Sequence, residues 1–274
     1  MYTVSDLDKD LSTLESHGAK VFTVGYSRLG RPIKGVFKGA TDGPQLLVQG
    51  AIHAREWVTA QLSVLLFERY SGKCGLWCIP MSNPDGAMLA QLGLDSVGDP
   101  EIRDFLYKIN GYSSDFSLWK ANGRAVDLNV NFNALWGTGV NNVTYPAPGN
   151  YIGPYPFSES ESTALAQFTD KVRPRYTVSY HARGRVIYYG FNGQNPDPSI
   201  PPLASSVTGY PAYTSEGSAG GYKDWFVLTT NRAGLTIEVG SEGTPYQDLQ
   251  KELPSMLRQN DGLLDALSVE TGEK

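Results

Sequence analysis

Apolar positions along this chain switch repeatedly between helical and strand spacing. Leu7, Leu11 and Leu14 recur at helical intervals, and with a cap at Thr3 or Ser5 they predict a helix over residues 3–18. Further helical patterns cover residues 57–70, Ser158 or Ser160 to Val172, and about 247–269. Apolar, β-prone runs predict strands over residues 20–26, 33–39, 46–52, 75–80, 175–190 and 234–239.

The order of these patterns indicates the fold class. Strands that alternate with helical patterns predict an α/β protein whose sheet is parallel in its centre. Residues 84–126 read as a long loop-and-helix region, and residues 191–224 are rich in loops. No internal repeat and no linker stands out, so we expect one domain over residues 1–274.

Composition narrows the class of protein. A hydrophobic content of 41% and a charged content of 19% are typical of an ordinary globular chain. The net charge of −5, without a basic cluster, argues against a nucleic-acid partner. No apolar run reaches the ~18 residues that cross a bilayer. No signal peptide is visible, so we expect a cytoplasmic location, or an extracellular or cell-wall location if a leader has been removed. We also expect a monomer.

Two residue types have structural interpretations. Cys74 and Cys78 lie in one apolar, strand-like run, where an extended backbone separates them too far for a good disulfide. We therefore expect two reduced, buried thiols. His17 falls in the last turn of the first predicted helix, where a partly cationic ring suits the helix dipole.

The chemistry of the chain centres on the stretch His53-Ala54-Arg55-Glu56-Trp57, which follows an apolar strand and precedes a helix. Strand-to-helix junctions are where α/β sheets place their ligand sites. His53 and Glu56 form an H-x-x-E pair that can aim one nitrogen and one carboxylate at a zinc ion. The alternative is a surface turn in which a histidine happens to precede an acid.

A second histidine strengthens the zinc hypothesis. Of the three histidines, His181 also lies at a strand exit, and parallel strand ends converge on one edge of a sheet. Together with His53 and Glu56 it completes the His₂Glu set of catalytic zinc, which leaves a position for water. Glu238, an acid inside an apolar run, is the candidate general base. Its alternative role is an outward-facing or ion-paired side chain at a strand end.

Six ordered motifs surround these residues: HAREW, SNPDG, WKANGRAVDLNVNF, FSESES, SYHARG, and GGYKDW with LTIEVG. In this order they resemble the carboxypeptidase A-like zinc metallopeptidases over residues 25–243. The resemblance implies a peptide substrate, one Zn²⁺ per chain, and an α/β/α sandwich on a mixed sheet of about eight strands.

The resemblance also implies roles for individual residues. His53, Glu56 and His181 would be the zinc ligands, and Glu238 would be the general base. Arg124 would steady the oxyanion of the scissile carbonyl, since a guanidinium aimed at developing charge lowers the barrier. Arg55 resembles a residue that contacts substrate further from the cut.

Two positions depart from the pattern of the family. Asn129 is present where the family binds a C-terminal carboxylate, but Val130 stands in place of the adjacent arginine. Valine cannot supply the bidentate, charge-assisted contact that a carboxylate needs. The position of the family's mobile tyrosine falls near Glu216, with Tyr213 and Tyr222 on either side.

These departures leave three functional hypotheses. The chain is most similar to bacterial γ-D-glutamyl-diaminopimelate peptidases, which cut murein (peptidoglycan) stem peptides. A conventional carboxypeptidase would instead hold the carboxylate with Asn129 and either Arg183 or Arg185, two cations that follow the second zinc histidine. The third hypothesis is a non-catalytic module that keeps zinc to bind peptide.

Overall fold

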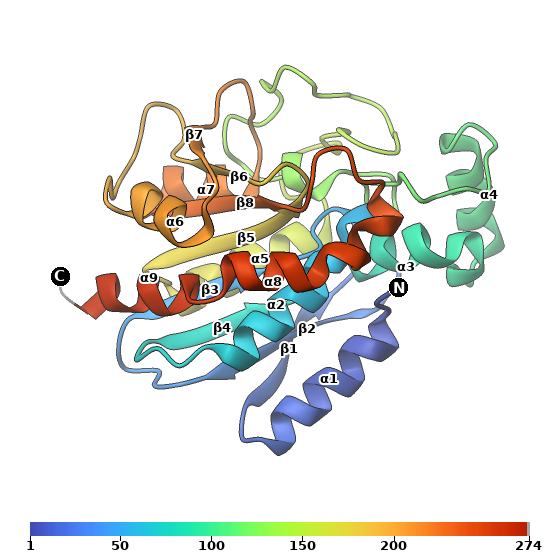
Figure 1. Cartoon of the computed structure of the whole chain (residues 1–274). Coiled ribbons are helices and arrows are strands. Elements are labelled where there is room, and N and C mark those ends of the chain that lie inside the picture. The colour runs from blue at the N-terminus through green and yellow to red at the C-terminus, as the bar shows by residue number, and fades with distance from the viewer. Residues whose placement is uncertain (273–274) are drawn as a thin grey trace.

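The computed structural model describes residues 1–272. Eight strands form one sheet in the order β1-β2-β4-β3-β5-β8-β6-β7 (Figure 1). Their bounds are β1 Lys20–Tyr26, β2 Pro32–Lys38, β3 Gln45–Gln49, β4 Gly75–Ile79, β5 Tyr176–Ala182, β6 Val186–Tyr189, β7 Ala212–Thr214 and β8 Gly234–Val239.

The directions of the strands make the sheet mixed, with a parallel centre. β4, β3, β5 and β8 are neighbours and all run parallel. β2 pairs with β4 in the antiparallel sense, as β1 does with β2 and β6 with β8. This topology confirms the predicted centrally parallel, eight-stranded sheet.

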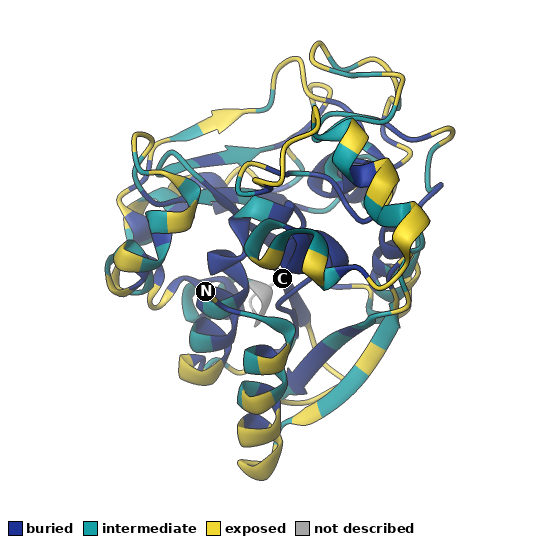
Figure 2. Ribbon diagram, turned by 90° about the vertical axis from the view of Figure 1, so that its right-hand side faces the viewer, coloured by how far each residue is buried: buried dark blue, intermediate teal, exposed yellow. Residues whose placement is uncertain are grey.

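Helices cover both faces of the sheet, as Figure 1 shows. One face packs against α1 (Val4–Ser16), α2 (Val58–Arg69), α6 (Ile200–Thr208), α8 (Leu253–Asn260) and α9 (Leu263–Gly272). The other face packs against α5 (Ser160–Val172) and α7 (Tyr222–Thr230). Buried residues concentrate on the strands and on the inner sides of the helices (Figure 2). The expected α/β/α sandwich is therefore confirmed.

A third apolar cluster lies beside the layers. It includes residues of α3 (Pro84–Leu92), α4 (Pro100–Ile109) and the loop that follows α4. Trp119 is buried in this cluster and directly precedes residues 120–131, which contribute side chains to the site. No helix within residues 1–272 is both long enough and apolar enough to cross a membrane.

Local chemistry sets the ends of the predicted helices. Thr3 caps α1 through a reciprocal capping box with Asp6, as the sequence predicted. His17 is the C-cap of the same helix. α5 ends where Arg173 adopts a left-handed conformation before Pro174.

Three predictions of elements need correction. The predicted strand over 175–190 is two strands, because the chain reverses at residues 183–185 between β5 and β6. The predicted helix over 247–269 breaks after Asn260, where Gly262 has a positive φ of 82°, and it begins as a 3₁₀ helix, η4 (Tyr246–Glu252). The loop-rich region over 191–224 also contains α6 and β7. The two cysteines form no disulfide and are buried, as expected.

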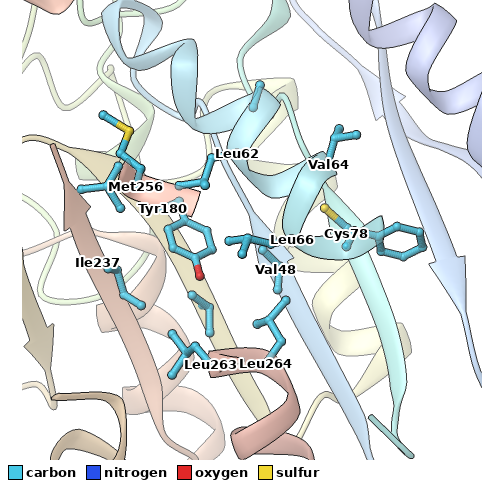
Figure 3. Packing of buried hydrophobic residues seen from close by; sticks show 14 of the residues in the cluster. Val48, Leu62, Val64, Leu66, Cys78, Tyr180, Ile237, Met256, Leu263 and Leu264 are labelled. Atoms are coloured by element: carbon cyan, nitrogen blue, oxygen red, sulfur yellow. The ribbon is translucent and has the colours of Figure 1, made fainter. Parts of the chain in front are cut away.

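The Tyr180 hydroxyl lies in the larger core and lacks a hydrogen-bond partner among the described residues. Tyr180 of β5 is 1% exposed, and Figure 3 shows its ring among aliphatic side chains such as Leu62 and Leu66 of α2. A buried hydroxyl without a partner costs about 1–3 kcal/mol of stability.

We expect Tyr180→Phe to raise the free energy of unfolding by about 1 kcal/mol, because it removes the unsatisfied hydroxyl and keeps the ring. The matched control is Tyr176→Phe, four residues earlier on the same strand and on the same face of the sheet. The Tyr176 hydroxyl donates to Asp197 Oδ2 over 2.8 Å, so this variant should be less stable than the parent. Chemical denaturation measures both. A loss of stability in Tyr180→Phe would contradict the expectation.

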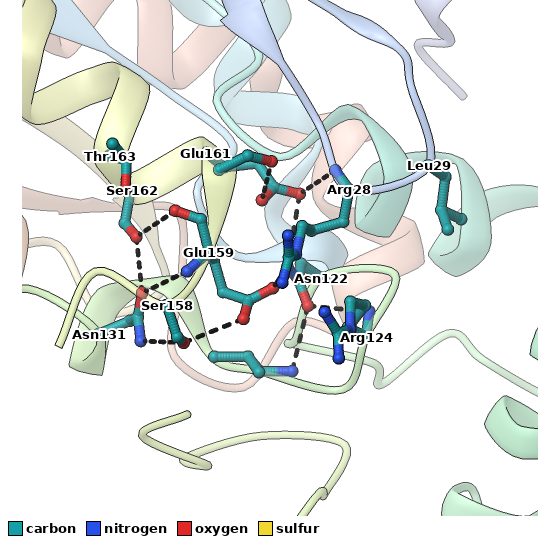
Figure 4. A network of polar contacts seen from close by, with 12 residues as sticks. Arg28, Leu29, Asn122, Arg124, Asn131, Ser158, Glu159, Glu161, Ser162 and Thr163 are labelled. Carbon is teal, nitrogen blue, oxygen red and sulfur yellow. Dashed lines mark hydrogen bonds and ion pairs between the residues drawn. The ribbon is translucent and has the colours of Figure 1, made fainter. Parts of the chain in front are cut away.

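A buried polar network ties the start of α5 to the loop that precedes the site (Figure 4). Asn122 donates to Glu159 Oε2 over 2.9 Å, and Asn131 donates to the Ser158 hydroxyl over 3.0 Å. Ser162 in turn donates to Asn131 Oδ1 over 2.6 Å. These contacts hold both ends of residues 120–131, the segment that contributes side chains to the site.

Glu161 is the unusual acid in this network. Its carboxylate accepts the Arg28 backbone N–H over 3.1 Å, while Glu159 forms the ion pair with the Arg28 side chain. Burial, together with the nearby charges of Asp85 and Glu159, raises the pKa of Glu161 to about 7. The folded state therefore prefers the protonated form of this side chain.

A group whose pKa is raised on folding contributes stability below its unfolded pKa, and that contribution is lost as the pH rises through the folded pKa. The unfolding free energy should therefore fall between pH 5 and pH 8, by on the order of 2 kcal/mol more in the parent than in Glu161→Gln. The matched control is Glu15→Gln on the exposed side of α1. Equal pH dependence of the parent and Glu161→Gln would refute this assignment.

Candidate active site

The first two candidate ligands come directly after the central strand β3. The chain leaves β3 at Gln49 and passes through Gly50, where a Cβ atom would lie 2.7 Å from Thr59 O. The Thr59 hydroxyl also accepts the Ala51 N–H over 2.8 Å. This tight turn leads into the 3₁₀ helix η1 (Ala54–Glu56), with His53 as its N-cap. The junction thus fixes the backbone of the H-x-x-E pair.

The structure brings His53, Glu56 and His181 together, although His181 lies 128 positions away from His53. Glu56 Oε1 is 2.9 Å from His53 Nδ1, and Glu56 Oε2 is 3.2 Å from His181 Nδ1. The two Nδ1 atoms are 3.2 Å apart. The Ala182 N–H of β5 also donates to Glu56 Oε2 over 3.1 Å, which holds the carboxylate at the strand end.

The three residues fit a zinc ion. One ligand atom from each lies within 4.8 Å of the others, and all three side chains are buried. The Nδ1 atoms of both imidazole rings lie within 3.2 Å of a Glu56 carboxylate oxygen, so one ion can be shared by all three side chains. Two histidines and one glutamate form the three-residue ligand set that catalytic zinc uses.

The charges of the cluster favour the ionised form of Glu56. Burial alone would raise the pKa of Glu56, but the two histidines hold it well below its ordinary value. Burial alone would lower the pKa of His53, but the charges of Glu56 and Asp127 raise it. An anionic Glu56 is the form that binds a metal.

Asp127 contacts the cluster through the second ring nitrogen of His53, and Lys120 pairs with Asp127. His53 Nε2 lies 3.4 Å from Asp127 Oδ1, and Lys120 Nζ lies 2.8 Å from Asp127 Oδ2. Burial opposes the charge of Asp127, yet Lys120 and His53 keep its pKa well below its ordinary value. A carboxylate on the second nitrogen of a ligating histidine orients the ring and makes it more basic.

Glu238 lies on β8 at the position that pairs with His181 of β5, so the two side chains emerge on the same face of the sheet. Burial, followed by the repulsion of the Glu56 carboxylate, raises the pKa of Glu238 to about 7. A carboxylate that titrates near neutral pH is suited to exchange protons with a reacting group.

Arg124, the expected oxyanion residue, is not brought to this cluster. Residues 122–126 turn around the Asn122 side chain, whose Oδ1 accepts the N–H groups of Arg124 and Val126. This turn leaves the side chain of Arg124 exposed. The cation of this segment that lines the cavity next to Glu238 is Lys120.

The three other candidate arginines lie near η4. The guanidinium groups of Arg55 and Arg183 lie 4.4 and 5.0 Å from the centre of the Tyr246 ring. Arg185 instead pairs with Glu252 over 3.3 Å. None of the three lines the cavity that contains Asn129. Arg183 and Arg185 therefore do not share a cavity wall with Asn129, the residue that a conventional carboxypeptidase would have them assist.

A cavity of about 330 Å³ adjoins Glu238. Asn129 and Val130 form one wall, and Asn129 Oδ1 accepts the Tyr222 N–H over 3.1 Å. Glu216 lines the cavity, whereas the Tyr222 hydroxyl is buried 2.8 Å from Thr169 and Tyr213 is exposed. Neither tyrosine that flanks Glu216 in the sequence lines this cavity.

Four residues of the site were not predicted from the sequence. Lys120, Asp127, Tyr188 and Lys223 all contact either the cluster or the cavity. Lys120 and Asp127 stand in the quoted motif WKANGRAVDLNVNF, whose third charged residue is Arg124, and the available signal was charge next to apolar side chains. Lys223 stands beside Asp224 within the apolar start of α7, which carries the same signal.

We expect Asp127→Asn to weaken zinc binding by about 10- to 100-fold, since it removes the charge that orients His53. Competition with a chromophoric chelator measures the affinity. The matched control is Asp115→Asn, because Asp115 is exposed and accepts a backbone N–H two residues ahead, as Asp127 does. Unchanged affinity in Asp127→Asn would remove Asp127 from the metal site.

Known proteins share both the sequence pattern and the fold. The chain is 31% identical over 243 residues to γ-D-glutamyl-L-diamino acid endopeptidase 1 of Lysinibacillus sphaericus. The match covers 81% of this chain but only 61% of that relative, so the chain spans less than two thirds of its length.

Two solved structures show the same fold. Bovine thrombin-activatable fibrinolysis inhibitor superposes with a TM-score of 0.75 at 17% identity, covering 97% of both chains. Murein-tripeptide amidase from Escherichia coli O157 superposes with a TM-score of 0.56 at 21% identity, covering 86% of this chain and 89% of the other. The zinc carboxypeptidase family matches residues 5–214, which include His53, Glu56 and His181. The chain therefore belongs to the zinc carboxypeptidase family of metallopeptidases.

Proposed function

We propose that this protein is a zinc-dependent peptidase that hydrolyses the amide bond between γ-D-glutamate and diaminopimelate in peptidoglycan stem peptides. The observation that carries the proposal is the cavity wall, where Val130 follows Asn129. A C-terminal carboxylate would find an amide there but no arginine. The name of the Lysinibacillus sphaericus relative, a γ-D-glutamyl-L-diamino acid endopeptidase, supports the same bond.

The residues of the chain divide the work of amide hydrolysis. Zinc held by His53, Glu56 and His181 would supply Lewis acidity, which lowers the pKa of water and polarises a carbonyl. Glu238 is placed to accept a proton on its carboxylate and return it to the leaving amine. The Lys120 ammonium lies on the cavity wall, where it can stabilise negative charge on the carbonyl oxygen.

The distribution of cations supports a substrate with an unusual placement of carboxylates. A γ-linked D-glutamate keeps a free α-carboxylate on the acyl side of the scissile bond. Arg55 and Arg183 lie around Tyr246, outside the cavity that Val130 lines, and they are suited to an anion there. Arg185 is already paired with Glu252, which weighs against its use by a conventional carboxypeptidase.

The zinc-loaded protein should cleave L-Ala-γ-D-Glu-meso-diaminopimelyl-D-Ala, in which the carboxyl group beside the scissile amide is itself in an amide bond, and leave hippuryl dipeptides with a free C-terminal L-residue largely intact. Glu238→Gln should lower the rate by about 10²- to 10⁴-fold with zinc retained, because it removes the proton acceptor. The matched control is Glu242→Gln, an exposed acid four residues later. Chromatography of the products and metal analysis give both readouts.

The opposite substrate preference would overturn the proposal in favour of a conventional carboxypeptidase. Full activity of the zinc-loaded Glu238→Gln variant would remove Glu238 from the chemistry. Binding of the peptides without turnover by the zinc-loaded parent would favour the non-catalytic binding module.

A further inference from the structure

A second hollow lies on the face of the sheet that α5 covers, away from the metal cluster. Its volume is about 790 Å³, within the range of about 300–1,000 Å³ that is typical of ligand sites. It runs along β1 and is bordered on the other side by α5. We call it the aromatic groove, because its lining includes the rings of Phe22, Phe37, Trp77 and Phe168.

The rings of the aromatic groove pack against one another. Phe22 and Phe168 stack with their ring centres 5.1 Å apart, and the Trp77 ring lies roughly perpendicular to both, at 5.4 and 5.5 Å. Gly35 of β2 makes room for Phe22, because a Cβ atom there would lie 2.5 Å from the ring. The Trp77 indole N–H donates to Gln45 Oε1 over 2.7 Å. The aromatic surface is therefore formed before any ligand binds.

The fold leaves part of this surface uncovered. Phe22, Trp77 and Phe168 are only partly buried, whereas Phe37 is 2% exposed. A group of partly exposed aromatic rings that lines a groove indicates an interaction site. The face of an aromatic ring carries partial negative charge, so it attracts the C–H groups of a saturated ring laid on it.

The rim of the aromatic groove is cationic. Lys20 at the start of β1 and Lys171 in the last turn of α5 both line it and are exposed. Among residues 1–272 no acidic side chain lines the groove. Neither rim lysine belongs to the ion-paired lysines of these residues, which are Lys9, Lys34, Lys108, Lys120, Lys223 and Lys251. Both ammonium groups are therefore available to an anion.

These features select the chemistry of the ligand. A sugar ring has C–H groups on its faces and hydroxyl or amide groups on its edges, and a glycan that carries carboxylates adds negative charge. Thr41 and Gln167, which are exposed and line the groove, can hydrogen-bond to the polar edges of a sugar. A second copy of this chain fits less well, because a twofold contact would bring the rim lysines of both copies together.

We propose that the aromatic groove binds an acidic glycan, with sugar rings on Trp77 and the phenylalanines and with carboxylates on Lys20 and Lys171. The inference rests on the proposed function for the identity of this glycan. It is the strand of peptidoglycan, whose alternate sugars carry either a lactyl carboxylate or an acidic stem peptide. The groove is thus a binding site for the polymer, separate from the site of bond cleavage.

The position of the groove allows both sites to be occupied at once. Gln45, which lines the groove, begins β3, whereas His53 and Glu56 follow the other end of this strand. The length of β3 alone, roughly 13 Å, separates the two ends. A polymer in the groove therefore leaves the metal cluster accessible. Its stem peptides are then present near the cluster at a raised effective concentration.

The direct test titrates ¹⁵N-labelled protein with two glycans of equal length. One is the peptide-free glycan of peptidoglycan, which has free lactyl carboxylates, and the other is neutral chito-oligosaccharide. The indole N–H signal of Trp77, assigned with Trp77→Phe, reports occupancy of the groove. We expect the parent to bind the acidic glycan about 3- to 30-fold more tightly, the range for two exposed charge pairs. Added salt should reduce this preference.

Variants of exposed residues test the rim without disturbing the fold. Lys20→Gln/Lys171→Gln should remove the preference for the acidic glycan and leave binding of the neutral glycan unchanged. The matched control is Lys9→Gln/Lys108→Gln, which removes two exposed lysines that lie outside the groove. Gln167→Glu places an acid one turn before Lys171 and should weaken the preference by neutralising that lysine.

Turnover separates this inference from the proposed function. On the free peptide L-Ala-γ-D-Glu-meso-diaminopimelyl-D-Ala, Lys20→Gln/Lys171→Gln should match the parent. On glycan strands that keep their stem peptides, the KM of this variant should rise by about 3- to 30-fold while kcat is unchanged. If the parent cuts neither substrate, the proposed function fails, and the glycan titration alone decides the inference.

Three results would overturn the inference. The first is no shift of the Trp77 signal with the acidic glycan, or equal affinity of the parent for the two glycans. The second is a concentration-dependent dimer that shifts this signal without glycan, which would assign the groove to a second copy of the chain. The third is a shift with vesicles of anionic phospholipid but not with glycan, which would assign the groove to a membrane surface.

Discussion

The parallel pairing of β5 with β3 on one side and β8 on the other is the constraint on which the site depends. In this register Ser179 faces Gln49 and His181 faces Glu238, so one edge of the sheet receives groups from three separate parts of the chain. The metal ligands then meet within hydrogen-bond distance, with the proton acceptor on the adjacent strand. Parallel strands place their carboxyl ends together, which is why the metal ligands and the proton acceptor lie at this edge of the sheet and not at the opposite one.

The sequence alone identified this edge, because each metal ligand directly follows or ends a recognisable apolar strand. His53 and Glu56 share a junction, and His181 ends an apolar strand, so topology alone predicts their convergence. Choosing between Arg124 and Lys120 needed more information. They are four residues apart in one loop, and the turn around Asn122 decides which cation reaches the cavity. Residue spacing carries no signal for such a turn, because side-chain hydrogen bonds from several segments create it.

The same limit explains the errors in the predicted elements. The apolar pattern continues from β5 into β6. It therefore predicted one long strand and gave no sign that the chain reverses direction between β5 and β6. Gly184, with a positive φ, and Gly262 were the signals for the two missed breaks. The buried network around Glu161 also could not be predicted, because its partners come from the β1–β2 turn, the loop after α4 and the start of α5. Only the assembled fold places these segments in contact.

Asp224 contacts two groups at the N-terminus of α7, because its Oδ2 accepts the Gly221 N–H over 3.3 Å and its Oδ1 pairs with Lys223 Nζ over 2.6 Å. The carboxylate that neutralises Lys223 thus also completes the first turn of a helix that supports the sheet. Loss of the Asp224 carboxylate would therefore leave Lys223 without its counter-charge and the Gly221 N–H without its acceptor, at the place where α7 borders the cavity.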